Sequence, residues 1–536
     1  MKKRYLFPAV IGVLALSAGL FAWWWNHNPH KIPDGLSISK PQAFAGYSLL
    51  APMSLNTTWL VDMEGRIVNE WKSDYPPALS VYLLENGHLL RPCNDSKERS
   101  SHDVPGTGGR IQEFDWNGEL VWDFHLESER YRPHHDICRL PNGNILMIAT
   151  DKKTDHEAVA AGRHPITVTV ELKPDAIIEV KPTGKTTGEI VWAWHAFDHL
   201  VQEYDNTKPN YGDIAAHPEL IDVNFSANRM DSMMLDPRQL SQLQSLGYVG
   251  ASKKPAPKRL MDGKGFTNGD WMHTNSVTYN ADLDQIMISL FEFSEVWVID
   301  HSTTTVEAAG HTGGRYGKGG DLLYRWGNPK TYHAGDVTHQ RLFSQHSAHW
   351  IPAGLPGAGH MLVFNNGLGR PGIPYSTVDE IELPVQADGS YALEPGEAFG
   401  PDAACWSYAA AEPFSFYSML VSGAQRLPNG NTFICSGKDG VVFEATPENE
   451  VVWRYKLPGM IDPEKLPKGP PPPPPPGTKP GQRPVPIGPG GLFRCNKYAP
   501  DYAAFTDKDL KPREPLGTAV AREVAALKGA ASKPDP

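Results

Sequence analysis

Short apolar stretches separated by turn residues recur along most of this chain. One recurring phrase has Asn-Gly at its tip: Leu140-Pro-Asn-Gly-Asn144 precedes an apolar stretch, and Leu427-Pro-Asn-Gly-Asn431 repeats the pattern. A weaker copy begins at Leu84. Asn-Gly between apolar residues favours the positive φ angles that a tight connection between two strands requires. These phrases therefore predict antiparallel hairpins.

A second phrase consists of a strand, a polar turn and a strand that ends in tryptophan. Its six copies end at Trp71, Trp122, Trp194, Trp326, Trp406 and Trp453. The two phrases alternate, and each pair supplies four strands, which is one blade of a β-propeller. The first tryptophan hairpin lacks a preceding partner, so strands near residues 492–498 are expected to complete its blade and close the ring. The pattern predicts an all-β fold, a six-bladed β-propeller over residues 45–510, with a pair of β-sandwiches as the alternative.

Three segments depart from this pattern. Residues 200–265 are polar and contain one helical signature, with Asp236 as N-cap, Pro237 at the first position and Gly247 at the end, which predicts a partly helical insertion. Residues 469–491 carry a proline run that favours an extended linker. Residues 517–536 are rich in Ala and Lys, and we expect them to form a flexible tail.

The N-terminus predicts a membrane anchor. Lys2-Lys3-Arg4 precedes an apolar run from Tyr5 to Trp25. A run of about 21 residues is long enough for a spanning helix, and basic residues stay on the cytoplasmic side. We expect residues 1–28 to form a transmembrane signal anchor that holds the protein in the inner membrane with its catalytic domain in the periplasm. Cleavage after Ser17 or Ala18, giving a soluble periplasmic protein, is the alternative.

Composition narrows the possible functions. The net charge of −11 and the pI near 6.0 argue against nucleic acid as a partner, because such proteins need a basic face. The five cysteines show no CxxC spacing, so a structural zinc site is not expected, although one or two disulfides are compatible with export. The chain lacks a Gly-rich nucleotide motif and a GxSxG elbow. No cofactor and no metal are predicted.

The histidines are concentrated in the first two thirds of the chain, and all 20 lie at or before His360. When the repeats are aligned on the proline of the hairpin phrase, the position six residues upstream holds Leu79, His135, His273, His346 and Ser422. Equivalent positions in successive blades face the same axis. Three imidazoles are therefore expected at one central site, where histidine suits proton transfer, nucleophilic attack or metal binding.

Polar residues suited to an anion follow one apolar strand. The segment from Asn365 to Arg370 contains two glycines, and Arg370 presents the paired N–H donors that bind sulfate or phosphate. Asn366 in this loop and Asn275 beside His273 are the other predicted substrate-binding residues. Trp271, Tyr375 and Phe416 are candidates for stacking on an aromatic substrate.

Several long motifs resemble the bacterial arylsulfate sulfotransferase family. They are DWMHTNS from Asp270, FSEVWVIDHSTT from Phe293, GGDLLYRWGNP from Gly319, QHSAHWIP from Gln345, VFNNGLGRP around Arg370 and SGAQRLPNGNT from Ser422. The resemblance implies a six-bladed propeller that transfers a sulfuryl group from an aryl sulfate to a phenol without a nucleotide donor. It implies that His273, His346 and Arg370 bind the sulfate, and that one funnel histidine is transiently sulfated.

This chain departs from the family pattern at one point. The family's sulfate-accepting histidine lies C-terminal to the arginine, whereas this chain has no histidine after His360 and has Ser422 in the later blade. Either His135, His273 or His346 is the nucleophile, or the transfer is direct, or the activity has changed. The alternatives are a non-catalytic ligand-binding propeller and a metal-dependent hydrolase with the three histidines as ligands.

Overall fold

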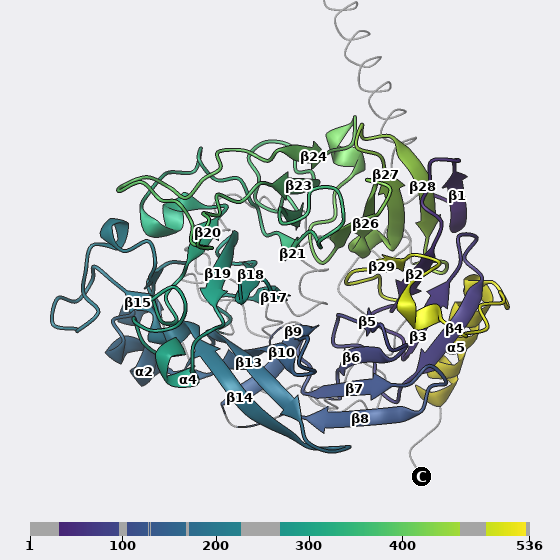
Figure 1. The fold of residues 1–536 in the computed structure, drawn as a ribbon, viewed down its shortest axis with the longest axis horizontal. Coiled ribbons are helices and arrows are strands. Elements are labelled where there is room, and N and C mark those ends of the chain that lie inside the picture. Colours follow the sequence, from purple (N-terminus) through teal and green to yellow (C-terminus); the bar gives the residue numbers. More distant parts are fainter. Residues whose placement is uncertain are drawn as a thin grey trace, which may run out of the picture.

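The computed structural model describes residues 32–95, 104, 106–126, 128, 130–167, 171–226, 269–460 and 489–531 of the 536. Six antiparallel sheets stand side by side around a common centre (Figure 1). Each sheet is one blade of a propeller, and strand order runs from the centre outward. The predicted six-bladed propeller is confirmed.

The strands of the blades follow one another along the chain, except in blade 1. Their bounds are: blade 1, β29 (Asn496–Tyr498), β2 (Tyr47–Leu50), β3 (Thr57–Val61) and β4 (Ile67–Lys72); blade 2, β5 (Tyr82–Leu83), β6 (Leu89–Cys93), β7 (Arg110–Phe114) and β8 (Leu120–His125); blade 3, β9 (Tyr131–Arg139), β10 (Ile145–Asp151), β13 (Asp175–Pro182) and β14 (Gly188–His195); blade 4, β17 (Thr274–Asn280), β18 (Gln285–Leu290), β19 (Glu295–Asp300) and β20 (Tyr324–Trp326); blade 5, β21 (His346–Trp350), β22 (Met361–Asn365), β23 (Thr377–Ile381) and β24 (Trp406–Tyr408); blade 6, β25 (Gly423–Arg426), β26 (Thr432–Ser436), β27 (Val441–Ala445), β28 (Val451–Lys456) and, outside it, β1 (Gly35–Ser39).

Two strand pairings join the ends of the chain. β29, near the C-terminus, is the innermost strand of blade 1 and pairs with β2, with Tyr498 opposite Tyr47. This is the ring closure expected from the unpaired first hairpin. β1 adds a fifth strand to blade 6 by pairing with β28. In Figure 1 the purple β1 therefore lies beside the green β28.

The six repeated tryptophans join neighbouring blades. Each lies on the fourth strand of its blade counted from the centre, and its indole N–H donates to a backbone carbonyl of the next blade at 2.7–3.2 Å. The pairs are Trp71 with Asp115, Trp122 with Thr187, Trp194 with Gly320, Trp326 with Pro401, Trp406 with Pro447 and Trp453 with Met63. The last pair returns from blade 6 to blade 1. The repeat found in the sequence is thus a closed ring of indole–carbonyl hydrogen bonds.

Loss of one of these bonds should destabilise the propeller measurably. Trp406→Phe removes the donor to Pro447 while keeping an aromatic ring, and we expect a loss of about 1 kcal/mol in the free energy of unfolding. Trp350→Phe is the matched control, because the buried Trp350 Nε1 has no hydrogen-bond partner among the described residues. Urea unfolding of both variants measures the difference. Equal destabilisation by both would assign the effect to ring size alone.

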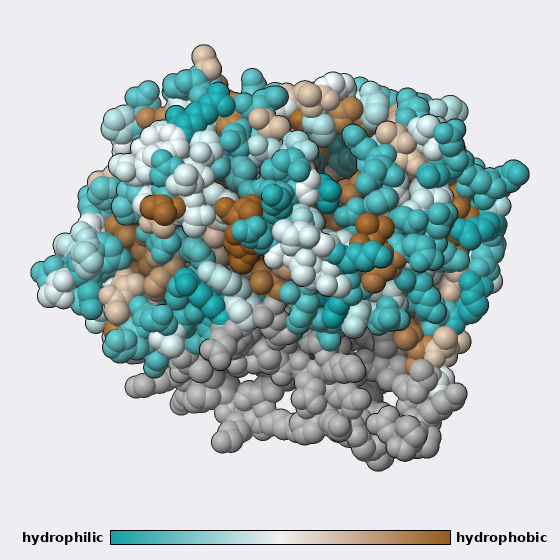
Figure 2. Space-filling view, turned by 60° about the horizontal axis from the view of Figure 1, so that its bottom comes forward, coloured by the Kyte–Doolittle hydropathy of each residue, from teal (hydrophilic) through white to brown (hydrophobic). Residues whose placement is uncertain are grey.

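The hydrophobic core lies between the blades. Six buried apolar clusters each fill the space between two neighbouring blades, and the sixth joins blades 6 and 1. A seventh cluster, which includes Phe291, Leu368, Leu420 and Phe493, draws residues from several blades. The face shown in Figure 2 is largely hydrophilic with scattered apolar residues. This arrangement leaves the innermost strand of each blade to carry the polar groups that face the centre.

The predicted flexible tail is wrong for most of its length. Residues Leu516–Ala531 form the helix α5, and Leu516, Ala519 and Val520 are buried against blades 6 and 1. The Glu523 carboxylate accepts the backbone N–H of Asn56 at 2.7 Å. Apolar residues at i, i+3 and i+4 had the helical period, but the Ala and Lys content obscured it.

The remaining elements are short and connect the blades. They are β11 (Lys153–Thr154), α2 (Asp155–Ala160), η2 (Pro165–Thr167), β12 (Glu171–Leu172), η3 (Ala196–Asp198), β15 (Leu200–Val201), η4 (Ile214–Ala216), β16 (Ile221–Asp222), α4 (Thr305–Ala308), η6 (Pro329–Tyr332), η7 (Pro413–Ser415), η8 (Gly437–Asp439) and η10 (Ala503–Phe505).

Several predicted features lie outside the described residues. They are the anchor at residues 1–28, the helix at 236–246 within the insertion, and most of the proline-rich segment at 469–491. Within the described part of the chain, no helix is long and apolar enough to cross a membrane. All five cysteines are described, and each is a free thiol rather than part of a disulfide.

Candidate functional site

The position identified by aligning the repeats is a real structural position. Leu79, His135, His273 and Ser422 all have left-handed backbone, with φ between 53° and 91°, near the inner end of blades 2, 3, 4 and 6. In blade 5 the left-handed residue is Ser347, directly after His346. We call His135, His273 and His346 the histidine column. Blades 2, 3, 4 and 6 bend at the aligned residue and blade 5 bends one residue after it, which is why the alignment of the repeats brought these positions together.

The three imidazoles of the histidine column lie in one buried region, two of them in direct contact and His346 across Phe291 and Phe493 from the other two. The rings of His135 and His273 lie 4.6 Å apart, and all three side chains are buried. Phe291 lies 5.1 Å from His273 and 5.5 Å from His346, while Phe493 lies about equally far from His135 and His346, at 6.0 and 6.2 Å. Three blades thus bring three histidines together, as the sequence predicted.

His346 carries an available lone pair on Nε2. Its Nδ1 lies 2.8 Å from Oδ1 of Asn366, and the Asn366 amide nitrogen donates to the carbonyls of Ser418 and Val421. The amide orientation is therefore fixed, and Nδ1 must carry the hydrogen. Burial, with the nearby charges of His273 and Arg494, lowers the pKa of His346 to about 3. Nε2 stays unprotonated, and no described residue hydrogen-bonds to it.

His135 is also neutral but has a different support. Its Nδ1 lies 2.8 Å from Nδ1 of His134, whose Nε2 lies 3.1 Å from the Asp175 carboxylate. Because the carboxylate only accepts, His134 Nε2 carries a hydrogen. One hydrogen lies between the two Nδ1 atoms, and when His135 carries it, His135 Nε2 keeps a lone pair. Burial is the main cause that holds the pKa of His135 well below its usual value. The Asp175 carboxylate is thus linked to His135 through His134 by two hydrogen bonds.

His273 is the member of the column whose protonated form is favoured. Its Nδ1 lies 2.6 Å from Oδ2 of Asp270, three residues earlier. Burial opposes a charge on this ring, but the Asp270 carboxylate outweighs burial and raises the pKa of His273. Burial alone would raise the pKa of Asp270, but the interaction with His273 outweighs burial and lowers it. The column therefore combines one imidazole whose protonated form is favoured with two whose neutral forms are favoured.

A buried arginine beside the column was not predicted. Arg494 donates to Tyr82 and Asp136, both at 2.9 Å, and to the carbonyl of Asn275 at 3.2 Å. Its charge is one of the causes that lower the pKa values of His135 and His346. Arg494 lies two residues before β29, and its contacts join the start of this strand to blades 2, 3 and 4. The closing strand β29 is an innermost strand, like β9 and β17. A search for polar residues just before it in the sequence could have found Arg494.

The predicted substrate-binding residues divide into two groups. Asn366 orients His346, as described above, and Asn275 donates to the carbonyl of Gln345, the residue before His346, at 2.8 Å. Arg370 instead lies between the rings of Phe343 and Tyr375, 5.0 and 4.3 Å from their centroids. The described contacts of Arg370 do not include a column histidine. Substrate binding by these three residues stays a prediction.

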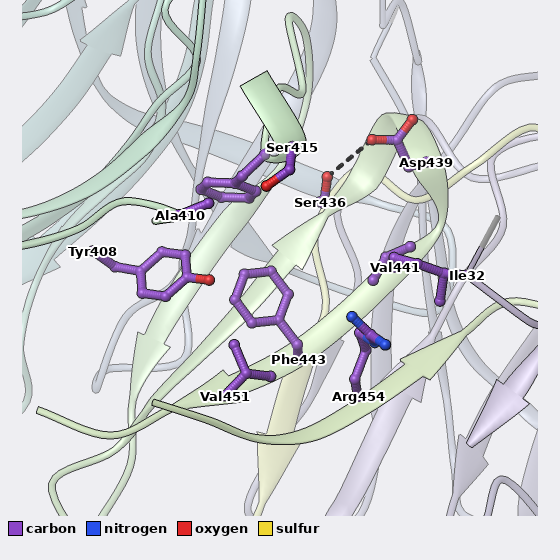
Figure 3. A pocket seen from close by; sticks show the side chains of 11 residues that line it. Ile32, Tyr408, Ala410, Ser415, Ser436, Asp439, Val441, Phe443, Val451 and Arg454 are labelled. Carbon is purple, nitrogen blue, oxygen red and sulfur yellow. Dashed lines mark hydrogen bonds between the residues drawn. The ribbon is translucent and has the colours of Figure 1, made fainter. Parts of the chain in front are cut away.

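The aromatic candidates lie apart from one another. Trp271 donates to the carbonyl of Phe225, and Tyr375 packs on Arg370 as described above. Phe416 lines a cavity of about 110 Å³ between blades 5 and 6, where Tyr408 and Phe443 also point inward (Figure 3). The lining of this cavity includes no column histidine. A stacking role for these rings is not tested by their positions.

Two groups of side chains in the described part of the chain could hold a metal ion, and both lie outside the column. They are His199 with His311 and Asp321, and His360 with Glu380 and Cys405. In the first group, both ring nitrogens of His199 are already bonded, to Asp321 and to the carbonyl of Ala308. Neither group includes a column histidine, so these groups do not support the hypothesis that the column is the metal centre of a hydrolase.

The comparisons with known proteins agree with the resemblance noted in the sequence. The sequence model of a family described as Arylsulfotransferase (ASST) matches residues 30–457. No curated protein matches the chain.

Many solved structures match distantly. A protein of unknown function from Bacteroides caccae is 12% identical, with 77% of this chain and 93% of that chain covered and a TM-score of 0.38. A streptogramin B lyase is 11% identical, with 81% and 86% covered and a TM-score of 0.34. Virginiamycin B lyase from Staphylococcus aureus is 9% identical, with 80% and 85% covered and a TM-score of 0.33. At this distance they carry no information on substrate or mechanism.

Proposed function

The chain belongs to the arylsulfotransferase family, and from this premise we propose that it transfers a sulfuryl group from an aryl sulfate to a phenol at the histidine column, without a nucleotide donor. One observation carries the proposal. Two imidazoles whose neutral forms are favoured, His135 and His346, lie in the same buried region as His273, whose protonated form is favoured. Sulfuryl transfer needs a nucleophile, a base and a positive charge in one place.

His346 is the best-placed nucleophile. Attack on sulfur needs a lone pair on Nε2 and a stable hydrogen on Nδ1, and the Asn366 amide supplies the second condition because it cannot take up a proton. The new bond joins His346 Nε2 to sulfur while the bond between sulfur and the aryl oxygen breaks. The departing phenolate takes a proton from the His273 imidazolium, which becomes neutral.

His135 is better suited to accept a proton than to attack. The Asp175 carboxylate behind His134 stabilises positive charge on this pair of rings, as a buried carboxylate does for a catalytic histidine. In the second half of the cycle the acceptor phenol loses its proton to His135, and its oxygen attacks sulfur as the bond to His346 breaks. A proton then passes from His135 to His273, whose ring is 4.6 Å away, and restores the starting state.

Ser422 does not take the role of the sulfate-accepting histidine that the family has in the later blade. Its hydroxyl oxygen lies 2.8 Å from that of Ser418 and accepts the backbone N–H of Gly437 at 3.0 Å. No described contact joins it to a histidine that could act as its base. In this chain the blade 6 position of the column is structural, which leaves the nucleophile in blades 3, 4 or 5.

Release of a phenol from a chromogenic aryl sulfate tests the proposed activity. The purified protein is incubated with 4-nitrophenyl sulfate, with and without an acceptor phenol, and nitrophenolate release is followed. We expect release that depends on the acceptor and that continues in the presence of a chelator. Release that stops with the chelator would favour the metal-dependent hydrolase, and no release from a panel of aryl sulfates would contradict the proposal.

The charge states of the column predict the pH dependence of the reaction. The working form needs His346 neutral, which holds above its pKa of about 3, and His273 protonated, which holds below its raised pKa. Activity should therefore fall as pH rises past the pKa of His273. Asp270→Asn removes the carboxylate that raises this pKa, so the alkaline fall should move to lower pH. The pH profile of kcat measures it.

A control separates this effect from a general loss of carboxylates. Asp388→Asn alters an exposed carboxylate whose described partner is Ser390 on its own turn, so its profile should match that of the unaltered protein. If the Asp270→Asn profile keeps the alkaline limb in place while only its height falls, His273 is not the group whose protonation the reaction requires.

A further inference from the structure

Three side chains at one edge of blade 5 form a compact set of metal-ligand types. His360 directly precedes β22, Glu380 lies on β23 and Cys405 directly precedes β24. Their ligand atoms all lie within 4.8 Å of one another, with His360 Nδ1 2.8 Å from Glu380 Oε1 and 3.8 Å from Cys405 Sγ. We propose that His360, Glu380 and Cys405 bind a divalent transition-metal ion of the zinc type at a site distinct from the histidine column.

The spacing of these atoms fits tetrahedral coordination. Zn²⁺ binds thiolate at about 2.3 Å and imidazole nitrogen at about 2.0–2.1 Å, which places tetrahedral N and S ligands about 3.6 Å apart. The observed separation of 3.8 Å needs little change. The nitrogen–oxygen separation must widen by about half an ångström from hydrogen-bond distance to ligand distance. A thiolate, an imidazole and a carboxylate together favour zinc-type ions over Mg²⁺ or Ca²⁺.

The strands hold the three residues independently of any ion. Glu380 pairs with Trp406 across β23 and β24, and the Cys405 N–H donates to the Glu380 carbonyl at 2.9 Å. His360 closes the connection between β21 and β22 by hydrogen bonds to Ile351 and Gly357. A Cβ at Gly357, where φ is +80°, would lie 2.3 Å from Glu380 Oε1, so only glycine leaves this oxygen accessible.

The surrounding charges support a bound dication. Arg426 pairs with the other oxygen, Oε2, and leaves Oε1 for His360 or for a metal. A carboxylate shared between a metal and an arginine is a common way to orient a ligand. Without an ion, Glu380 and Arg426 balance each other, and the nearby Glu382 adds a negative charge that a dication offsets. Cys405 is exposed, so solvent or a fourth ligand has access.

Protection of Cys405 from alkylation tests the site in the unaltered protein. Cys405 is the exposed cysteine of the five, whereas Cys93, Cys435 and Cys495 are buried and Cys138 is half-buried. Iodoacetamide labelling is quantified by mass spectrometry for each cysteine peptide, with and without Zn²⁺ added to the chelator-treated full chain. We expect Zn²⁺ to slow labelling of Cys405 at least 10-fold. Equal labelling rates would overturn the proposal.

Cobalt binding tests the ligand set directly. Co²⁺ should give a thiolate-to-cobalt charge-transfer band that disappears in Cys405→Ser, and His360→Ala should weaken Co²⁺ binding at least 10-fold. His311→Ala, in the other cluster, is the matched control and should leave the band and the affinity unchanged. A band that survives Cys405→Ser, or that is lost in His311→Ala, would place the ion elsewhere. Circular dichroism confirms that each variant is folded.

Discussion

Replacing His346 by alanine should lower kcat for sulfuryl transfer by at least about 10³-fold, because the substitution removes the atom that is proposed to bond to sulfur. The KM for the aryl sulfate should change much less, since His273 keeps its charge and His135 its support. The measurement is nitrophenolate release under saturating acceptor. No other change to a single side chain is expected to reduce the activity as far.

Chemical rescue distinguishes a nucleophile from a residue that only shapes the site. Added imidazole should restore part of the activity of His346→Ala, because the deleted ring leaves a space next to Phe291 and Phe493. His349→Ala is the matched control: this ring lies on the same strand and is half-buried, desolvation lowers its pKa to about 4, and its Nδ1 faces the carbonyl of Ser347. If His349→Ala loses as much activity as His346→Ala, the loss reflects packing of β21 rather than chemistry.

The fold could be predicted because residues with the same structural role recur in successive blades. The tryptophan at the end of each hairpin recurs because its indole must reach a carbonyl of the next blade, and the Asn-Gly tips recur because the turn between the two innermost strands needs positive φ. The helix α5 has no such repeat. Its apolar positions contact blades far away in sequence, and only the assembled ring shows what they pack against.

The site was predictable to the same extent and for the same reason. The column histidines lie at or next to a left-handed residue at the inner end of their blades, and alignment of the repeats found them. Their charge states depend on residues outside the repeat, such as Asp270 and Asp175, and on distant packing. Arg494 lies just before β29, the strand near the C-terminus that closes the ring, where the repeat is interrupted, and its partners Tyr82 and Asp136 come from two other blades. No local sequence pattern predicts the contact of Arg494 with Tyr82 and Asp136.

Arg494→Met should destabilise the protein by about 3–5 kcal/mol, because it leaves the buried Asp136 carboxylate without its cation. The side-chain volume is roughly kept, so the loss measures the charge rather than a cavity. Urea unfolding gives the free energy. Arg522→Met breaks an exposed pair with Glu514 and should change it little.

A double-mutant cycle shows whether the network acts as a unit. In Arg494→Met, the Asp136 carboxylate should destabilise the fold because it is buried without its cation. Asp136→Asn in this background should therefore recover part of the lost stability, with a coupling energy of about 1–3 kcal/mol. Asp136 also accepts from Tyr82 and from the backbone N–H of Val277, so it has other donors. Additive effects would mean that these donors satisfy the carboxylate alone. In that case Arg494 serves the column chiefly through its charge, and its loss should raise the pKa values of His135 and His346 and move the acid limb of the activity profile to higher pH.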